Sequence, residues 1–121
     1  MTPLPFLPRV RQHLQPALDH GGNTHGFEDI ILSVLKGDMQ LWTADKASAV
    51  TEVTDYPKKR VIHWFLAGGD MAAVLDFQQS IRTYGKALGC TEMTLSGRSG
   101  WQRALKSHGW TQKGIVMEAT L

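Results

Sequence analysis

Apolar residues recur with helical spacing in two stretches of the chain. Phe27, Ile30, Ile31, Val34 and Leu35 form one stripe at spacings of three and four, and Gly37 suits the end of a helix there. A longer stripe consists of five residues with the same spacing, Val74, Phe77, Ile81, Tyr84 and Leu88. Asp70 before this stripe and Gly89 after it suit the start and the end of a helix of about five turns.

Two shorter helices are indicated near the two ends of the chain. One covers about 7–18, where Pro16 should limit or bend it. The other is amphipathic, begins near Trp101 and ends at Gly109. The glycine-rich stretch between 19 and 26 is typical of a loop.

Strands are predicted for 39–43, 47–54, 60–66, 90–95 and 111–121. The third of these is apolar on both faces, which is typical of a central strand. Strict alternation would put Val61, His63 and Phe65 on one face and Ile62, Trp64 and Leu66 on the other.

The predicted order is therefore α-α-β-β-β-α-β-α-β, an α+β fold with a mixed β-sheet flanked by helices. A strand–helix–strand crossover of this length implies a parallel pair of strands. The 121 residues suffice for a single domain covering 1–121, in which 1–26 should be an irregular N-terminal segment.

Composition narrows the class of protein. The chain is 42% hydrophobic and 20% charged, which is ordinary for a globular protein. A net charge of +2 is too small for a dedicated nucleic-acid binder. No apolar run has the length of a transmembrane helix or of a signal peptide, so we expect a cytoplasmic protein and no membrane partner. Cys90 is the only cysteine, and the spacings of the five histidines match no common metal motif, so no metal site is expected.

The segment from Gly97 to Trp110 carries the most specific local pattern. Its helix ends in Gly109 followed by the aromatic Trp110. This pattern and the order of elements resemble the GNAT superfamily of N-acetyltransferases over about 27–121. The chain is also similar to small GNAT-like proteins of tailed phages and prophages, some of which are virion or assembly components. The resemblance implies a GNAT-like fold and acetyl-CoA as a possible acyl donor.

The resemblance also implies where an acyl donor would bind. Its thioester would lie beside the strand at Trp64, Phe65 and Leu66, and its pyrophosphate on the strand-to-helix turn formed by Ala67, Gly68, Gly69, Asp70 and Met71. Glycines permit close approach of the backbone to phosphate, and helix N-termini favour anions. The turn lacks the family's initial Arg or Gln, however, and Asp70 brings a negative charge. A plain tight turn capped by Asp70 explains the same residues. If the turn binds phosphate, a bulky residue at Gly69 should abolish binding and leave the fold intact.

Arg98, at the entrance to the last helix, is a further candidate for contact with a nucleotide phosphate. A solvated charged face explains it equally well.

His63 and Glu52 are the candidate catalytic residues. Acyl transfer to an amine needs a group that takes a proton from the ammonium, and histidine titrates in the right range. The other interpretations are a semi-buried histidine held by one hydrogen bond and a solvated strand glutamate. The family often has a tyrosine as general acid in the last helix, where this chain has Leu105.

Two hypotheses follow. The first is an acyl-CoA-dependent N-acyltransferase, in which a small molecule or a protein supplies the acceptor amine. The second is a catalytically inactive GNAT-like phage or prophage protein that binds a protein partner or a second copy of itself, in the host cytoplasm or in the virion. The resemblance implies that the loop around 20–27 borders the acceptor side, and we expect a substrate or a partner to be recognised there.

Overall fold

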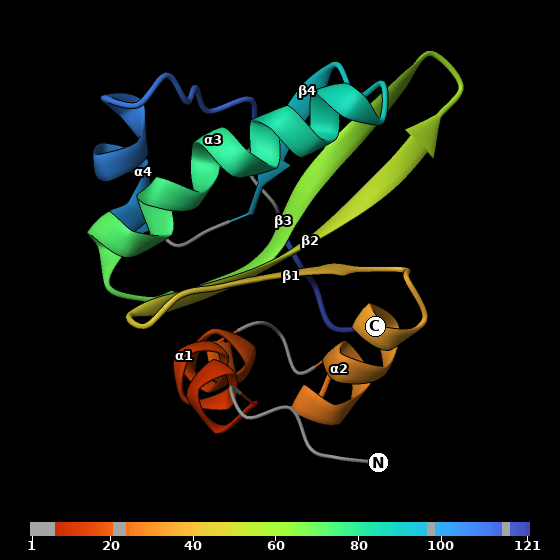
Figure 1. The fold of residues 1–121 in the computed structure, drawn as a ribbon. Coiled ribbons are helices and arrows are strands. Elements are labelled where there is room, and N and C mark those ends of the chain that lie inside the picture. The colour runs from red at the N-terminus through yellow and green to blue at the C-terminus, as the bar shows by residue number, and fades with distance from the viewer. Residues whose placement is uncertain (1–6, 21–23, 97–98, 115–116) are drawn as a thin grey trace.

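A computed structural model describes residues 7–20, 24–96, 99–114 and 117–121. The elements are four helices and four strands in this part of the chain (Figure 1): α1 (Leu7–His20), α2 (Phe27–Leu35), β1 (Gln40–Thr43), β2 (Ala47–Tyr56), β3 (Lys59–Gly69), α3 (Met71–Ala87), β4 (Glu92–Leu95) and α4 (Ser99–Lys106). This confirms the mixed α+β fold predicted from the sequence.

The four strands form one sheet in the order β1-β2-β3-β4. The pairs β1–β2 and β2–β3 are antiparallel, whereas β3 and β4 are parallel and are connected through α3. Figure 1 shows α1 and α2 on one face of the sheet and α3 and α4 on the other. The predicted parallel pair is therefore present, and β4 lies at the edge of the described sheet.

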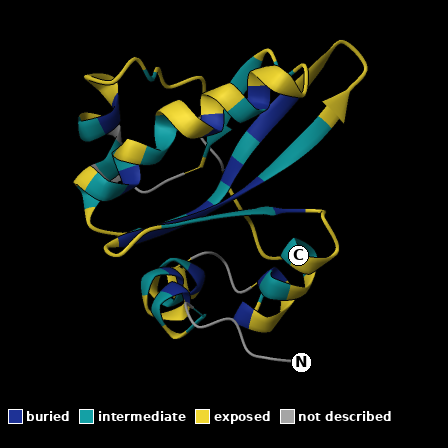
Figure 2. Ribbon diagram, in the orientation of Figure 1, coloured by how far each residue is buried: buried dark blue, intermediate teal, exposed yellow. Residues whose placement is uncertain are grey.

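Each face of the sheet has its own hydrophobic core (Figure 2). The core under α1 and α2 contains Val10, Leu14, Ile30 and Val50, all of which are fully buried. On the other face, the core under α3 and α4 contains the buried residues Ala47, Ala49, Ile62, Trp64, Val74 and Ile81. Burial of each large aliphatic side chain contributes about 1.5–3 kcal/mol, so the two cores fix the helices on both faces.

A β-bulge interrupts β3 at Phe65. Val50 pairs with Leu66 and Thr51 pairs with Trp64, so Phe65 has no partner on β2. As a result Phe65 and Leu66 both contact the core under α1 and α2, while Trp64 and Ala67 contact the other core. The strict alternation predicted for 61–66 therefore holds through Phe65 and is wrong at Leu66, because one extra residue reverses the faces that follow it.

The clearest differences from the predicted elements concern β3, α1 and the last predicted strand. Strand β3 continues through Ala67 and Gly68 to Gly69, where a tight turn was expected, because these residues still pair with β2. Helix α1 continues through Pro16 to His20, so more of 1–26 is regular than predicted. The strand predicted for 111–121 is not formed by the described residues 111–114 and 117–121.

Within the described ranges, no helix combines the length and the apolar character needed to cross a membrane.

Candidate functional site

Strands β3 and β4 separate halfway along β3. Their parallel pairing runs from Val61–Glu92 to Trp64–Leu95, whereas the pairing of β3 with β2 continues to Gly69. Over 65–69, the edge of β3 that faces away from β2 therefore has no strand partner in the described part of the chain. Unpaired backbone groups on such an edge can bind an extended ligand as an added strand would.

Three polar side chains lie in a row across the sheet just before this separation. Glu52 on β2 is the cross-strand partner of His63 on β3, and His63 pairs in turn with Thr94 on β4. All three are half-buried. The alternation of each strand places them on the face covered by α1 and α2. The two residues chosen as catalytic candidates from the sequence are thus direct neighbours.

His63 is held by a hydrogen bond. Its Nδ1 lies 2.8 Å from Oγ1 of Thr94. Burial lowers the pKa of His63 below its ordinary value of 6.5, and the nearby Glu52 carboxylate opposes this shift in part. A lowered pKa keeps the imidazole neutral near pH 7. In the tautomer that carries its proton on Nδ1, the Nδ1–H donates a hydrogen bond to the hydroxyl oxygen of Thr94, and Nε2 keeps a free lone pair.

Thr94 was missed by the sequence analysis. Its only signal is its position in the middle of the strand predicted for 90–95, between Met93 and Leu95, which contact the opposite core. That alternation puts Thr94 on the α1–α2 face, but only the register of β3 with β4 brings it to His63.

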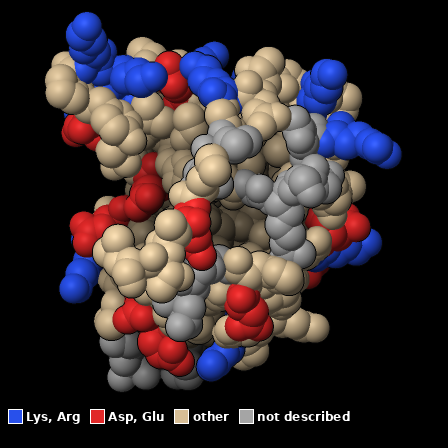
Figure 3. Space-filling view, turned by 180° about the vertical axis from the view of Figure 1, so that it is seen from behind, with Lys and Arg blue, Asp and Glu red and all other residues tan. Residues whose placement is uncertain are grey.

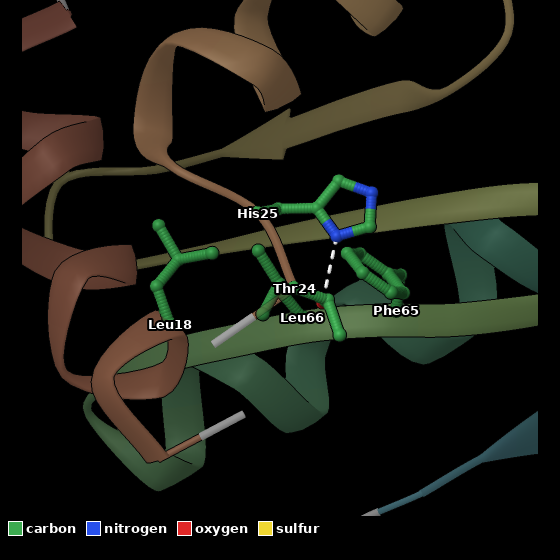
Figure 4. A pocket seen from close by; sticks show the side chains of 5 residues that line it. All are labelled: Leu18, Thr24, His25, Phe65 and Leu66. Atoms are coloured by element: carbon green, nitrogen blue, oxygen red, sulfur yellow. Dashed lines mark hydrogen bonds between the residues drawn. The ribbon is translucent and has the colours of Figure 1, made fainter. Parts of the chain in front are cut away.

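A small cavity of about 60 Å³ lies beside the bulge (Figure 4). Phe65 and Leu66 form its floor, Leu18 of α1 forms a wall, and Thr24 and His25 come from the loop before α2. The ring of His25 stands edge-on to that of Phe65, with centroids 4.9 Å apart, and its Nδ1 lies 2.7 Å from Oγ1 of Thr24. The loop before α2 therefore borders the point where β3 leaves β4.

The two glycines of the predicted phosphate turn are required by packing. A Cβ on Gly68 would lie 2.0 Å from the carbonyl oxygen of His13 in α1. Gly69 has φ +108°, and a Cβ there would lie 2.3 Å from the carbonyl oxygen of Lys46. The expectation that a bulky residue at Gly69 would leave the fold intact is therefore wrong, because both the backbone conformation and the contact with Lys46 exclude it.

Asp70 caps the N-terminus of α3. Its carboxylate accepts a hydrogen bond of 3.1 Å from the backbone N–H of Ala73, and its own N–H donates to the carbonyl of Lys46. Both Asp70 and Gly69 are exposed. A phosphate would find the helix N-terminus here, together with a carboxylate that already uses one of its donors.

No tyrosine reaches the row of polar residues in the described part of the chain. Leu105 is buried in α4 at the position where the resembling family often has a tyrosine. Tyr84 packs edge-on against Trp42 on the α3 side, and Tyr56 lies exposed at the end of β2. A general acid supplied by tyrosine therefore has no counterpart among the described residues of the site.

Charge and metal-binding groups add little to this site. Figure 3 shows a hollow on the back of the molecule, with Asp and Glu side chains around it. No group of three or more His, Cys, Asp or Glu within the described ranges could hold a metal ion. Burial raises the pKa of the Cys90 thiol, which disfavours the thiolate. The predicted contact at Arg98 lies outside the described residues.

The arrangement of helices and strands is similar to that of solved acetyltransferases. A probable acetyltransferase superimposes with a TM-score of 0.70 at 12% identity, covering 99% of this chain and 93% of the other. An acetyltransferase of Trypanosoma brucei gives 0.62 at 11% identity, covering 92% and 94%. The aminoglycoside acetyltransferase meta-AAC0020, from an uncultured soil metagenomic sample and in complex with sisomicin, gives 0.64 at 11% identity, covering 97% and 89%.

No protein-family model matches the sequence, and the search of curated proteins found no match. The identities to the solved structures are low, so the similarity concerns the fold: the chain has a GNAT-like fold.

Proposed function

We propose that this protein is an N-acyltransferase that transfers a short acyl group from an acyl-coenzyme A, such as acetyl-CoA, to an amine. The observation that carries this proposal is the position of the Glu52–His63–Thr94 row beside the open edge of β3. Fold alone does not determine activity, but this row places a neutral base next to a place where an extended thioester arm can lie.

The open edge at 65–69 suits the donor's amide-containing arm. Backbone groups there can pair with amides along the arm, and the thioester would sit beside the bulge at Phe65. The donor's phosphates would lie near Gly68, Gly69, Asp70 and Met71 at the start of α3. Of these groups, Asp70 opposes binding because its carboxylate is negative.

His63 and Glu52 would have different roles toward the acceptor amine. The Glu52 carboxylate attracts the ammonium form of the amine, and Nε2 of neutral His63 accepts one of its protons. The freed amine nitrogen attacks the carbonyl carbon and the carbon–sulfur bond breaks. The proton on His63 passes to the departing thiolate, and the acylated nitrogen loses its remaining extra proton to solvent. Thr94 holds the imidazole in place for this transfer.

The test begins with isothermal titration calorimetry of acetyl-CoA on protein freed of carried-over ligand. We expect binding with one site per chain. Mass spectrometry of a panel of amines incubated with protein and acetyl-CoA should then find an acetylated product that His63→Gln no longer forms. The variant Gln79→Ala on the exposed surface of α3 serves as the matched control and should retain activity.

A lack of acetyl-CoA binding would support the alternative function, that of an inactive GNAT-like module. If acetyl-CoA does not bind at millimolar concentration, the N-acyltransferase proposal fails. The capping of α3 by Asp70 and the buried Leu105 are the observations that favour an inactive GNAT-like module, which would act by binding a protein partner.

A further inference from the structure

One tryptophan beside the open edge has an indole N–H without a partner. Trp64 is only 4% exposed, and its Nε1 is buried and makes no hydrogen bond in the described structure. Two other tryptophans that contact the same core do have partners. Nε1 of Trp42 donates to Oγ1 of Thr51 at 2.9 Å, and Nε1 of Trp110 donates to Oε1 of Gln78 at 2.8 Å.

A buried donor without an acceptor is unfavourable and uncommon in folded proteins. Packing alone does not require a tryptophan at this position, because a phenylalanine would fill much of the same apolar space without bringing an unsatisfied donor. The indole N–H of Trp64 therefore points to an acceptor that comes from outside the chain.

The position of Trp64 indicates which ligand could supply that acceptor. Trp64 and Leu95 form the last pair between β3 and β4, so the open edge begins at the next residue, Phe65. The Trp64 ring lies in the core under α3 and α4, edge-on to Trp110 with centroids 6.0 Å apart. A ligand arm laid along the open edge would therefore begin next to Trp64. A neutral carbonyl is the fitting acceptor, because bringing a phosphate into this apolar core would carry a large desolvation cost.

We propose that the indole N–H of Trp64 donates a hydrogen bond to an amide carbonyl oxygen in the arm of the acyl donor. This inference rests on the proposed N-acyltransferase function and adds a residue that recognises the arm. The nucleotide end of the donor takes no part in this contact. Trp64 acts here as a binding residue and plays no part in proton transfer.

The first test is NMR on ¹⁵N-labelled wild-type protein, in which each of the four tryptophans gives one indole N–H signal. The signals are assigned by single replacements of tryptophan with phenylalanine. On titration with coenzyme A, the Trp64 proton should move downfield as its hydrogen bond forms, and the signals of Trp42 and Trp110 should move less. If W64F does not fold, replacements at the other three positions assign Trp64 by elimination.

The second test compares affinities by calorimetry. Trp64→Phe should weaken the binding of coenzyme A by about 3- to 10-fold, the effect of losing one neutral hydrogen bond. Binding of adenosine 3′,5′-bisphosphate, which lacks the arm, should not change. Trp110→Phe is the matched control, because its N–H already has an internal partner.

The two proposals fail in different ways. If wild-type protein binds no coenzyme A, the N-acyltransferase proposal fails and the role of Trp64 fails with it. If wild-type protein binds coenzyme A but the Trp64 signal stays in place, the inference about Trp64 alone is overturned, and a buried water is the partner of its N–H. Equal affinities of the W64F variant and wild-type protein would overturn it as well.

Discussion

Replacement of Gly68 by alanine should destabilise the fold through a contact between β3 and α1. The new methyl carbon would lie 2.0 Å from the backbone oxygen of His13. A normal carbon–oxygen contact is about 3.3 Å or longer, so the helix and the strand would have to move apart by about 1.3 Å. Both atoms belong to secondary structure, so no side chain can rotate away to relieve the clash. Overpacking of this kind costs about 1–3 kcal/mol, and we expect about 2–3 kcal/mol here.

The melting temperature measures this cost. With about 2.1 cal/mol/K of unfolding entropy per residue, a chain of 121 residues loses about 4 °C for each kcal/mol. Gly68→Ala should therefore lower Tm by about 8–12 °C in differential scanning calorimetry. Gly37→Ala is the matched control, because Gly37 has φ +85° and a methyl group there would meet no atom within 4 Å beyond its chain neighbours. That variant adds only backbone strain, about 1–2 kcal/mol, which is offset in part by the lower entropy of the unfolded alanine chain.

The opposite result would refute the packing explanation of Gly68. If Gly68→Ala melts at the wild-type temperature and loses acetyl-CoA binding, the glycine serves a ligand that approaches the backbone. A fall in Tm similar to that of Gly37→Ala would mean that α1 yields easily, and the contact with His13 would not then explain the glycine.

Four other predictions concern the site. Asp70→Asn keeps the helix cap and removes a negative charge. For a carboxylate and a phosphate charge about 5 Å apart in water, this should strengthen acetyl-CoA binding by about 0.8 kcal/mol, or about fourfold. Unchanged affinity in calorimetry would mean that the phosphates bind elsewhere. Because the pKa of His63 is lowered from 6.5 on folding, the unfolded chain takes up this proton first. The stability of wild-type protein in urea should accordingly fall as pH is lowered through 6.5, more than that of His63→Gln, and Glu52→Gln should lower the pKa of His63 further in an NMR titration. Thr94→Val should lower kcat by about 2- to 12-fold with little change in KM, because one hydrogen bond that orients the imidazole is lost. Full activity in a steady-state assay would show that His63 does not need the hydrogen bond to Thr94.

The sequence predicted the elements because their patterns are local. The sequence analysis placed Glu52 and His63 in two consecutive predicted strands. Their direct alignment was not predictable in the same way, since it depends on the register of β2 with β3. The bulge at Phe65 was also missed. It is defined by a count of residues on two strands, and nothing in the run Trp64-Phe65-Leu66 marks it.

The glycine pair shows a different limit of sequence reasoning. Two glycines before a helix suggest either a phosphate turn or a tight turn, and both explanations are local. The structure gives a third explanation that depends on distant residues: Gly68 faces His13 of α1, and Gly69 faces Lys46 between β1 and β2. From the sequence alone, a glycine that allows close packing of another backbone segment cannot be distinguished from a glycine that allows close approach of a ligand.

These contacts determine how much each end of a bound acyl donor, its phosphates or its amide arm, would contribute to the binding affinity. The start of α3 offers little to a phosphate, because its glycines serve packing and Asp70 occupies one of its donors. The groups still free for a ligand lie further back along β3, at the open edge from Phe65 onward and at Nε1 of Trp64. Affinity for an acyl donor would therefore come mainly from its amide arm. Since neutral hydrogen bonds are screened far less by salt than charge pairs are, the proposed binding mode predicts an affinity for the acyl donor that changes little with salt concentration.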